Sequence, residues 1–211
     1  MPTTAGSRIL QNAFPVRDSW VAKKLRDAGA IIIGKSNLSE WANYRASYSS
    51  SGWSGLGGQT KNPYVLDRNP CGSSSGSAVA VSANLCAIAI GTETWGSIMC
   101  PSNANGIVGI KPTVGLWSRA GIIPISYTQD TAGPMSRNVE DAAVMLGTLT
   151  GVDDNDDKTK ESKNNSFKDY TQFLKKEGLQ GKRIGYVKTM NGKNHRLDLL
   201  MKNTIKDLEK G

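Results

Sequence analysis

The sequence predicts an α/β fold, in which helices alternate with short buried strands. Near the N-terminus, a helical pattern that ends at Gly29 is followed at once by the β-branched run 30–34, which is typical of a buried strand. Further along, the apolar segment 78–90 lies between two loops rich in glycine and hydroxyl side chains. This succession of helix, glycine and buried strand is characteristic of α/β proteins.

The N-terminal elements follow from local signals. Residues 1–17 are polar and irregular. Asp18 or Ser19 can cap a helix that runs to about Ala28, where Gly29 provides the C-terminal stop.

A long segment rich in glycine, serine and asparagine extends from residue 44 to residue 71. A connection of this length inside a compact domain is often functional. Because Trp41, Trp53 and Tyr64 lie in or beside it, we expect the segment to pack against the rest of the domain.

Small and apolar residues define the next elements. Residues 76–84 predict a helix that can approach a sheet closely, and residues 87–90 predict a buried strand that ends at the second glycine-rich loop. Residues 106–113 predict a strand stopped by proline, and residues 138–149 predict a helix capped by Asn138.

The domain organisation is predicted from a polar run near the end of the chain. Residues 1–150 are expected to form the core, and the charged run 151–166 is interpreted as an exposed or disordered linker or surface loop. Residues 167–211 begin a further part of the same fold, with a strand over 183–187 and an amphipathic helix over 194–209.

Composition excludes several classes of protein. The chain has 26 basic and 18 acidic residues, a net charge of +8, but the two signs are mixed, which disfavours specific nucleic-acid binding and leaves a basic binding module as an alternative. Three cysteines without CxxC spacing favour a reducing compartment and argue against a disulfide framework or a zinc site. Without a signal peptide or an apolar run of about 20 residues, the sequence predicts a soluble, cytoplasmic protein that binds no membrane.

The chemistry depends on two serines, Ser73 and Ser97, in the two glycine-rich loops. A flexible linker is the simplest interpretation of such a loop, but both flanks here are apolar. A serine nucleophile needs a base and donors for its oxyanion. His195, the one histidine, lies beyond the polar run in a surface-type helix, which disfavours a Ser-His-Asp triad. GxSxG and P-loop patterns are absent, so a Ser-Ser-Lys arrangement remains.

The stretch from CGSSSGSAVAV through GTETWGSI to GIKPT resembles the signature of the amidase signature family, with further matches at MPTTAGS, AGAIIIGKSNLSEWA and QDTAGPMSRNVEDAA. The residues in these motifs are most similar to those of the peptide-amidase-like branch of the family. The resemblance implies a partial amidase-signature fold, a mixed β-sheet core flanked by helices, in a chain truncated at both ends. It also implies no cofactor and no metal.

The resemblance assigns roles to individual residues. Ser97 would be the nucleophile that forms an acyl-enzyme. Ser73, on a cis peptide bond, would pass the proton to a neutral lysine, and we attribute Gly72 and Gly76 to the unusual dihedral angles of that loop. The backbone N–H groups of Thr94, Trp95, Gly96 and Ser97 would form the oxyanion hole.

Three departures from the family pattern bear on activity. The family's catalytic lysine would precede Met1, and neither Lys35 nor Lys111 is the base in the family. Trp95 stands where glycine or a small acid is usual, and would crowd the acyl pocket or tilt the loop. Met99 replaces an arginine, so Glu93 is expected to lose its usual partner.

The sequence therefore predicts a hydrolase of carboxamide C–N bonds that is inactive or weakly active without its lysine. The alternatives are a non-catalytic truncated fragment, one half of a split amidase, and the glutamine-hydrolysing subunit of a tRNA-dependent amidotransferase. The expected substrate is a small amide or a peptide amide, and the expected partner is a complementary chain that supplies the lysine segment.

Overall fold

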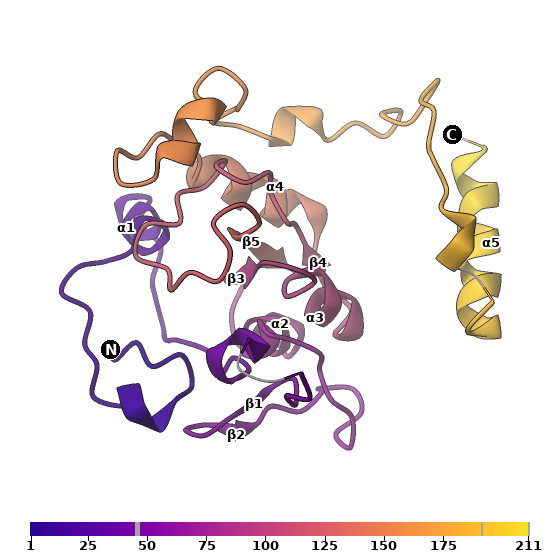
Figure 1. The fold of residues 1–211 in the computed structure, drawn as a ribbon. Helices are drawn as coiled ribbons and strands as arrows, with labels where there is room; N and C mark the ends of the chain where they lie inside the picture. The colour runs from indigo at the N-terminus through magenta and orange to yellow at the C-terminus, as the bar shows by residue number, and fades with distance from the viewer. Residues whose placement is uncertain (45–46, 191, 211) are drawn as a thin grey trace. The chain divides into compact units, whose positions relative to one another are not determined.

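The computed structural model describes residues 1–44, 47–190 and 192–210, which Figure 1 draws as a ribbon. These residues belong to two compact units, Met1–Thr171 and Gln172–Gly211. The predicted domain division at residues 150 and 166 stays a prediction. Among the described residues, no helix combines the length and the apolar character needed to span a bilayer.

The first unit contains both helices and strands. Its α-helices are α1 (Trp20–Asp27), α2 (Ser75–Ser82), α3 (Met99–Ala104) and α4 (Val139–Thr148). Short 3-10 helices lie at Arg8–Leu10, Glu40–Asn43 and Asp157–Ser162. The strands are β1 (Trp53–Ser54), β2 (Gly58–Gln59), β3 (Ile88–Glu93), β4 (Val108–Gly109) and β5 (Thr131–Ser136).

The central sheet has the order β3-β5-β4, and both of its pairings are antiparallel. The side chains of β5 alternate between its two faces. Ala132 belongs to a cluster with residues of α4, whereas Met135 packs with Ala78 of α2 and with Ile98. Helices α4 and α2 therefore cover opposite faces of the same small sheet.

The larger core lies on the α4 face of the sheet. Trp117 is fully buried there among residues of α1 and α4, and its indole Nε1 donates to the carbonyl of Leu146 at 2.9 Å. Trp20 of α1 donates in the same way to the carbonyl of Leu149 at 3.2 Å. Trp117 thus buries its ring completely and Trp20 in part, while each indole N–H donates to a carbonyl near the end of α4.

Several sequence predictions are confirmed. The expected helices over 19–28, 76–84 and 138–149 correspond to α1, α2 and α4, and the expected strand over 87–90 is the start of β3. The N-caps of α1 and α4 are Ser19 and Asn138, whose side chains accept from the backbone N–H groups of Ala22 and Asp141.

Two predicted strands differ from the structure. The run 30–34 forms no strand, and Ile31 and Ile33 are 89% and 72% exposed, because no described segment pairs with it. The prediction of a buried strand there was wrong. Only Val108–Gly109 of the predicted strand 106–113 pairs with the sheet.

The segment 44–71 is held to the domain chiefly by polar contacts. Asn37 donates to the carbonyl of Gly58 at 3.0 Å and accepts from the hydroxyl of Ser54 at 2.7 Å. The hydroxyl of Ser39 accepts from the backbone N–H of Gly52 at 2.8 Å. The expected anchoring by aromatic side chains is weak at Tyr64, which is 69% exposed.

The polar run 151–166 is partly buried, contrary to the expectation of an exposed or disordered linker. Asp153 and Asp156 are less than 10% exposed, and Thr159 is fully buried. Asp153 accepts from the hydroxyl of Ser118 at 2.6 Å, and Asp156 pairs with Arg119 at 2.7 Å. Specific partners on a loop of the core therefore satisfy the carboxylates that made this run look solvent-exposed.

The second unit holds one long helix, α5 (His195–Leu208), which confirms the helix expected over 194–209. Short 3-10 helices lie at Lys188–Met190 and, at the boundary of the units, at Thr171–Phe173. The strand predicted over 183–187 does not form, and those described residues are exposed.

Candidate active site

The two glycine-rich loops meet where α2 and α3 begin. Ser73 lies two residues before the first residue of α2, and Ser97 lies in the turn between β3 and α3. The backbone N–H of Ser74 donates to the carbonyl of Ser97 at 3.1 Å. The Ser74 hydroxyl also donates to the carbonyl of Thr92 and accepts from its N–H, both at 3.1 Å. The structure therefore brings the two predicted serine segments together.

The peptide bond between Gly72 and Ser73 is cis, and Ser73 is 2% exposed. Its carbonyl accepts from the backbone N–H of Ser39 at 3.0 Å. A Cβ at Gly72 would lie 2.5 Å from the Ser39 hydroxyl, and one at Gly76 would lie 2.5 Å from the backbone nitrogen of Asn37. Neither glycine has a positive φ. Close approach to the 37–39 segment, and not the unusual dihedral angles that we expected, therefore requires glycine at these positions.

Glu93 organises the turn that carries Ser97. It is 5% exposed, and its carboxylate accepts from the backbone N–H groups of Ile98 and Met99 at 2.6 and 2.9 Å. Lys111 lies 3.8 Å from the same carboxylate and donates to the carbonyl of Thr94 at 2.6 Å. Met99 supplies no arginine to Glu93, as expected, but two backbone N–H groups and Lys111 take the place of that partner.

The predicted oxyanion loop spans Thr94 to Ser97. Its first side chain is fixed by Asp130, which accepts from the Thr94 hydroxyl at 2.5 Å. In the part of the chain that the structure describes, the backbone N–H groups of Trp95, Gly96 and Ser97 donate to no protein acceptor. Such N–H groups at the start of a helix are suited to an oxyanion.

The side chain of Trp95 projects into solvent. It is 91% exposed, and Gly96 beside it has a φ of +84°. The left-handed glycine turns the chain sharply between the indole and Ser97. Crowding of the acyl pocket, which we expected from Trp95, is therefore not seen within this unit.

Cys71 and Cys100 form a disulfide, with their Cα atoms 5.8 Å apart. The expectation that the three cysteines form no disulfide was wrong. The two residues are 29 positions apart in the sequence, but the chain returns through α2 and β3 to the same point. Spacing rules for short motifs such as CxxC do not detect a pair of this kind.

Lys35, Lys111 and His195, the candidate bases, differ in their contacts and exposure. Lys35 donates to the carbonyl of Pro2 at 3.2 Å and to the hydroxyl of Thr3, and burial lowers its pKa, an effect that nearby Asp18 partly offsets. Lys111 donates a hydrogen bond to the Thr94 carbonyl. His195 is exposed at the start of α5.

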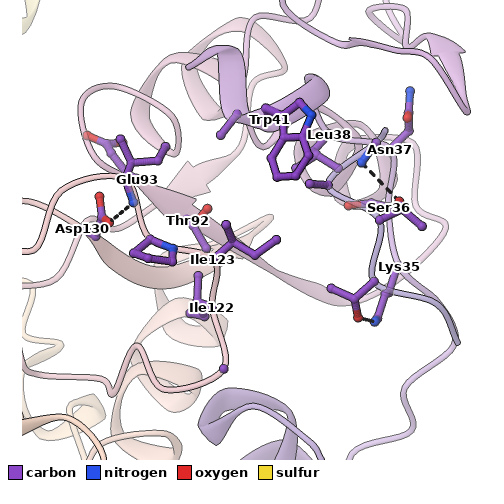
Figure 2. A pocket seen from close by; sticks show the side chains of 18 of the residues that line it. Lys35, Ser36, Asn37, Leu38, Trp41, Thr92, Glu93, Ile122, Ile123 and Asp130 are labelled. Atoms are coloured by element: carbon purple, nitrogen blue, oxygen red, sulfur yellow. Dashed lines mark hydrogen bonds between the residues drawn. The ribbon is translucent and has the colours of Figure 1, made fainter. Parts of the chain in front are cut away.

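A cavity of about 670 Å³ lies beside the serine loops, in the size range of small-molecule sites. Its lining includes Lys35, Trp41, Glu93 and Ile123, which Figure 2 shows with their neighbours. The cavity shares the end of β3 with the site, but neither serine lines it. The cavity is thus bordered by residues 35–38, which directly follow the unpaired run 30–34, and by residues 92–94, which lead to Ser97.

Replacing Lys111 by methionine is expected to lower the free energy of unfolding by about 1–3 kcal/mol, because the carbonyl of Thr94 loses its donor and buried Glu93 loses its cation. Urea unfolding measures this change. Lys61→Met, at an exposed lysine, is the matched control and should unfold like the parent. Equal stability of both variants would contradict the assigned role of Lys111.

The fold and the paired serine loops define an α/β protein of the amidase type. The sequence model of the amidase family matches residues 1–211, so the chain belongs to the amidase family. A probable amidase of Arabidopsis thaliana is 52% identical over 186 residues, which cover 88% of this chain and 36% of that protein. A glutamyl-tRNA(Gln) amidotransferase subunit of Gloeothece citriformis is 44% identical and is matched over 97% of this chain and 40% of its own length.

Solved structures agree with this assignment. The native peptide amidase from Stenotrophomonas maltophilia is 53% identical, with a TM-score of 0.94. The alignment covers all of this chain and 43% of the peptide amidase. The chain therefore spans less than half the length of these relatives and has a partial amidase fold.

Some site residues were missed by the sequence analysis. Asp130, which fixes Thr94, and Ser39, which holds both Ser73 and Gly52, had no assigned role. Asp130 lies inside the QDTAGPMS motif, so the motif match was the one signal that pointed to it.

Proposed function

We propose that this chain is the serine-bearing part of an amidase that hydrolyses a carboxamide C–N bond through an acyl-Ser97 intermediate. The single observation that supports it most strongly is the contact between the Ser73 and Ser97 segments in a chain of the amidase family. The Ser97 hydroxyl attacks the carbonyl carbon and passes its proton by way of Ser73 to a base. The C–N bond then breaks, the amine leaves with a proton, and water releases the acyl group.

The developing oxyanion would be held by the backbone N–H groups of the loop from Thr94 to Ser97. Glu93 supports this role, because it fixes the N–H groups of Ile98 and Met99 directly behind the loop. Removing one such oxyanion donor typically costs about 10²- to 10³-fold in rate.

The base in this proposal is a lysine supplied by a complementary polypeptide segment, without which residues 1–211 turn over slowly or not at all. The exposed isoleucines Ile31 and Ile33 and the neighbouring cavity support an extended, apolar segment as the occupant. The relatives have more than half of their length outside the matched region, which is sufficient to contain such a segment.

A peptide amide or another small amide is the substrate class we favour, since a peptide amidase shares 53% identity with the chain. The second candidate is glutamine hydrolysis within a tRNA-dependent amidotransferase, which the 44% identity to a protein of that name supports. A non-catalytic truncated fragment and a basic binding module are the remaining alternatives. The cytoplasmic location stays a prediction from the sequence, and the Cys71–Cys100 disulfide argues against the reducing compartment on which it partly rested.

Labelling with a fluorophosphonate tests the nucleophile. We expect slow covalent attachment to Ser97, identified by mass spectrometry, that disappears in Ser97→Ala. Ser102→Ala, at a buried serine of α3, serves as the matched control and should keep the label. Equal labelling of Ser97→Ala and the parent would remove the enzyme interpretation.

A further inference from the structure

The Cys71–Cys100 disulfide joins the two serine segments covalently. Cys71 directly precedes the cis bond between Gly72 and Ser73, and Cys100 is the second residue of α3, three positions after Ser97. The disulfide and the hydrogen bond from the Ser74 N–H to the Ser97 carbonyl therefore connect the same two segments.

Hydrogen bonds also span these two segments. The Ser74 hydroxyl bonds to the backbone of Thr92, and the amide of Asn105 after α3 donates to the carbonyl of Pro70 at 2.8 Å. Ile98, directly after Ser97, packs against Ala78 of α2. The covalent bridge adds to these contacts, because it limits the separation of the two segments even when a hydrogen bond between them breaks.

The backbone at Cys71 also depends on its surroundings. Its φ is +59°, a left-handed conformation that residues other than glycine adopt rarely and only when neighbouring contacts hold them. The Cys71 N–H donates to the side chain of Asn69 at 2.7 Å, which is one such contact. The bond to Cys100 is the other, and it acts one residue before the cis peptide.

We propose that the Cys71–Cys100 disulfide is a positioning element of the candidate active site, so that its reduction lowers the reactivity of Ser97. This inference rests on the proposed function of Ser97. Cys100 is exposed, and a dithiol reductant can therefore attack the bridge by thiol–disulfide exchange. The S–S bond breaks, both cysteines become thiols, and the reductant becomes a cyclic disulfide, so that two electrons and two protons pass to the protein.

Two readouts on the full chain test this role, one independent of activity. We expect reduction with dithiothreitol to raise hydrogen exchange of the amides of Ile98 and Met99, which donate to Glu93, at least tenfold while exchange in α4 stays constant. Fluorophosphonate labelling of Ser97 should fall about ten- to a hundredfold, as expected for a displaced reacting group, and should recover on reoxidation. Cys100→Ser should behave like the reduced parent.

The matched control is Cys86→Ser, because Cys86 is the cysteine outside the bridge. It should behave like the parent in both redox states. Unchanged exchange at Ile98 and Met99 after reduction overturns the proposal, and so does an equal rise in α4, which would make the bridge a general support of the unit. Increased local exchange in a protein whose Ser97 is never labelled supports the positioning role and ends the proposed function.

Discussion

Supplying a lysine-bearing segment is expected to raise the rate of amide hydrolysis by residues 1–211 about 10²- to 10⁴-fold, the usual contribution of a general base. The segment can be taken from the part of the Stenotrophomonas maltophilia peptide amidase that lies outside its match to this chain, since the two proteins are 53% identical over the match. It would be coexpressed as a separate polypeptide. Release of ammonia from a peptide amide, followed with the mixed and the isolated components, measures the gain.

Three controls separate base catalysis from stabilisation. The same segment with its lysine replaced by methionine should still bind, but it should not activate. Ser97→Ala with the intact segment should remain inactive. Ile31→Asp, on the exposed and unpaired run 30–34, should weaken binding of both segments. Equal activation by the methionine segment, or rapid turnover by residues 1–211 alone, would show that the base is misidentified.

Asp156→Asn is expected to lower the free energy of unfolding by about 3–5 kcal/mol at pH 7, because it leaves Arg119 buried without its counter-charge. The two side chains are 5% and 10% exposed. Asp156 accepts from the backbone N–H and the Nε of Arg119, both at 2.8 Å, in addition to the Nη2 contact at 2.7 Å. Denaturant unfolding measures the loss.

The pH dependence of this loss has a defined sign. Hydrogen bonds from Arg119 hold the pKa of Asp156 below its ordinary value of 3.8, and they outweigh the opposing effect of burial. A lowered pKa in the folded state stabilises the protein fully above the unfolded pKa, and this stabilisation is lost as the pH falls through the folded value. The difference between parent and Asp156→Asn should therefore be constant from pH 5 to 7 and shrink below pH 4. Asp157→Asn, at a 75% exposed carboxylate, should change little at any of these pH values.

Helices were predicted better than strands, and the reasons are local. Helices α1 and α4 carry their own N-caps in Ser19 and Asn138, so the sequence marks where they begin. Strand β5 lies at the centre of the sheet but contains Gly133 and Pro134, residues that argue against a central strand, and it was not predicted. The run 30–34 has ideal strand residues but no described neighbour to pair with. Strand formation depends on a partner that a local pattern does not contain.

The candidate site could be predicted from the sequence only because of its long motifs. Those motifs led to Ser73 and Ser97, and the structure brings their segments together. The contact between Lys111 and the Thr94 carbonyl, and the bridge from Cys71 to Cys100, depend on how separate segments return to one point. Residue spacing along the chain does not encode that return, so neither contact could be predicted.

The alternation of side chains along β5 has a practical consequence for protein engineering. Ala132 contacts the cluster around Trp117, whereas Met135, three positions later, contacts the residues behind the serine loops. Mutations that improve thermal resistance on the first side fall in a different cluster of buried residues from mutations behind the serine loops on the second. Libraries for the two sides can therefore be built separately and combined, with nearly additive effects.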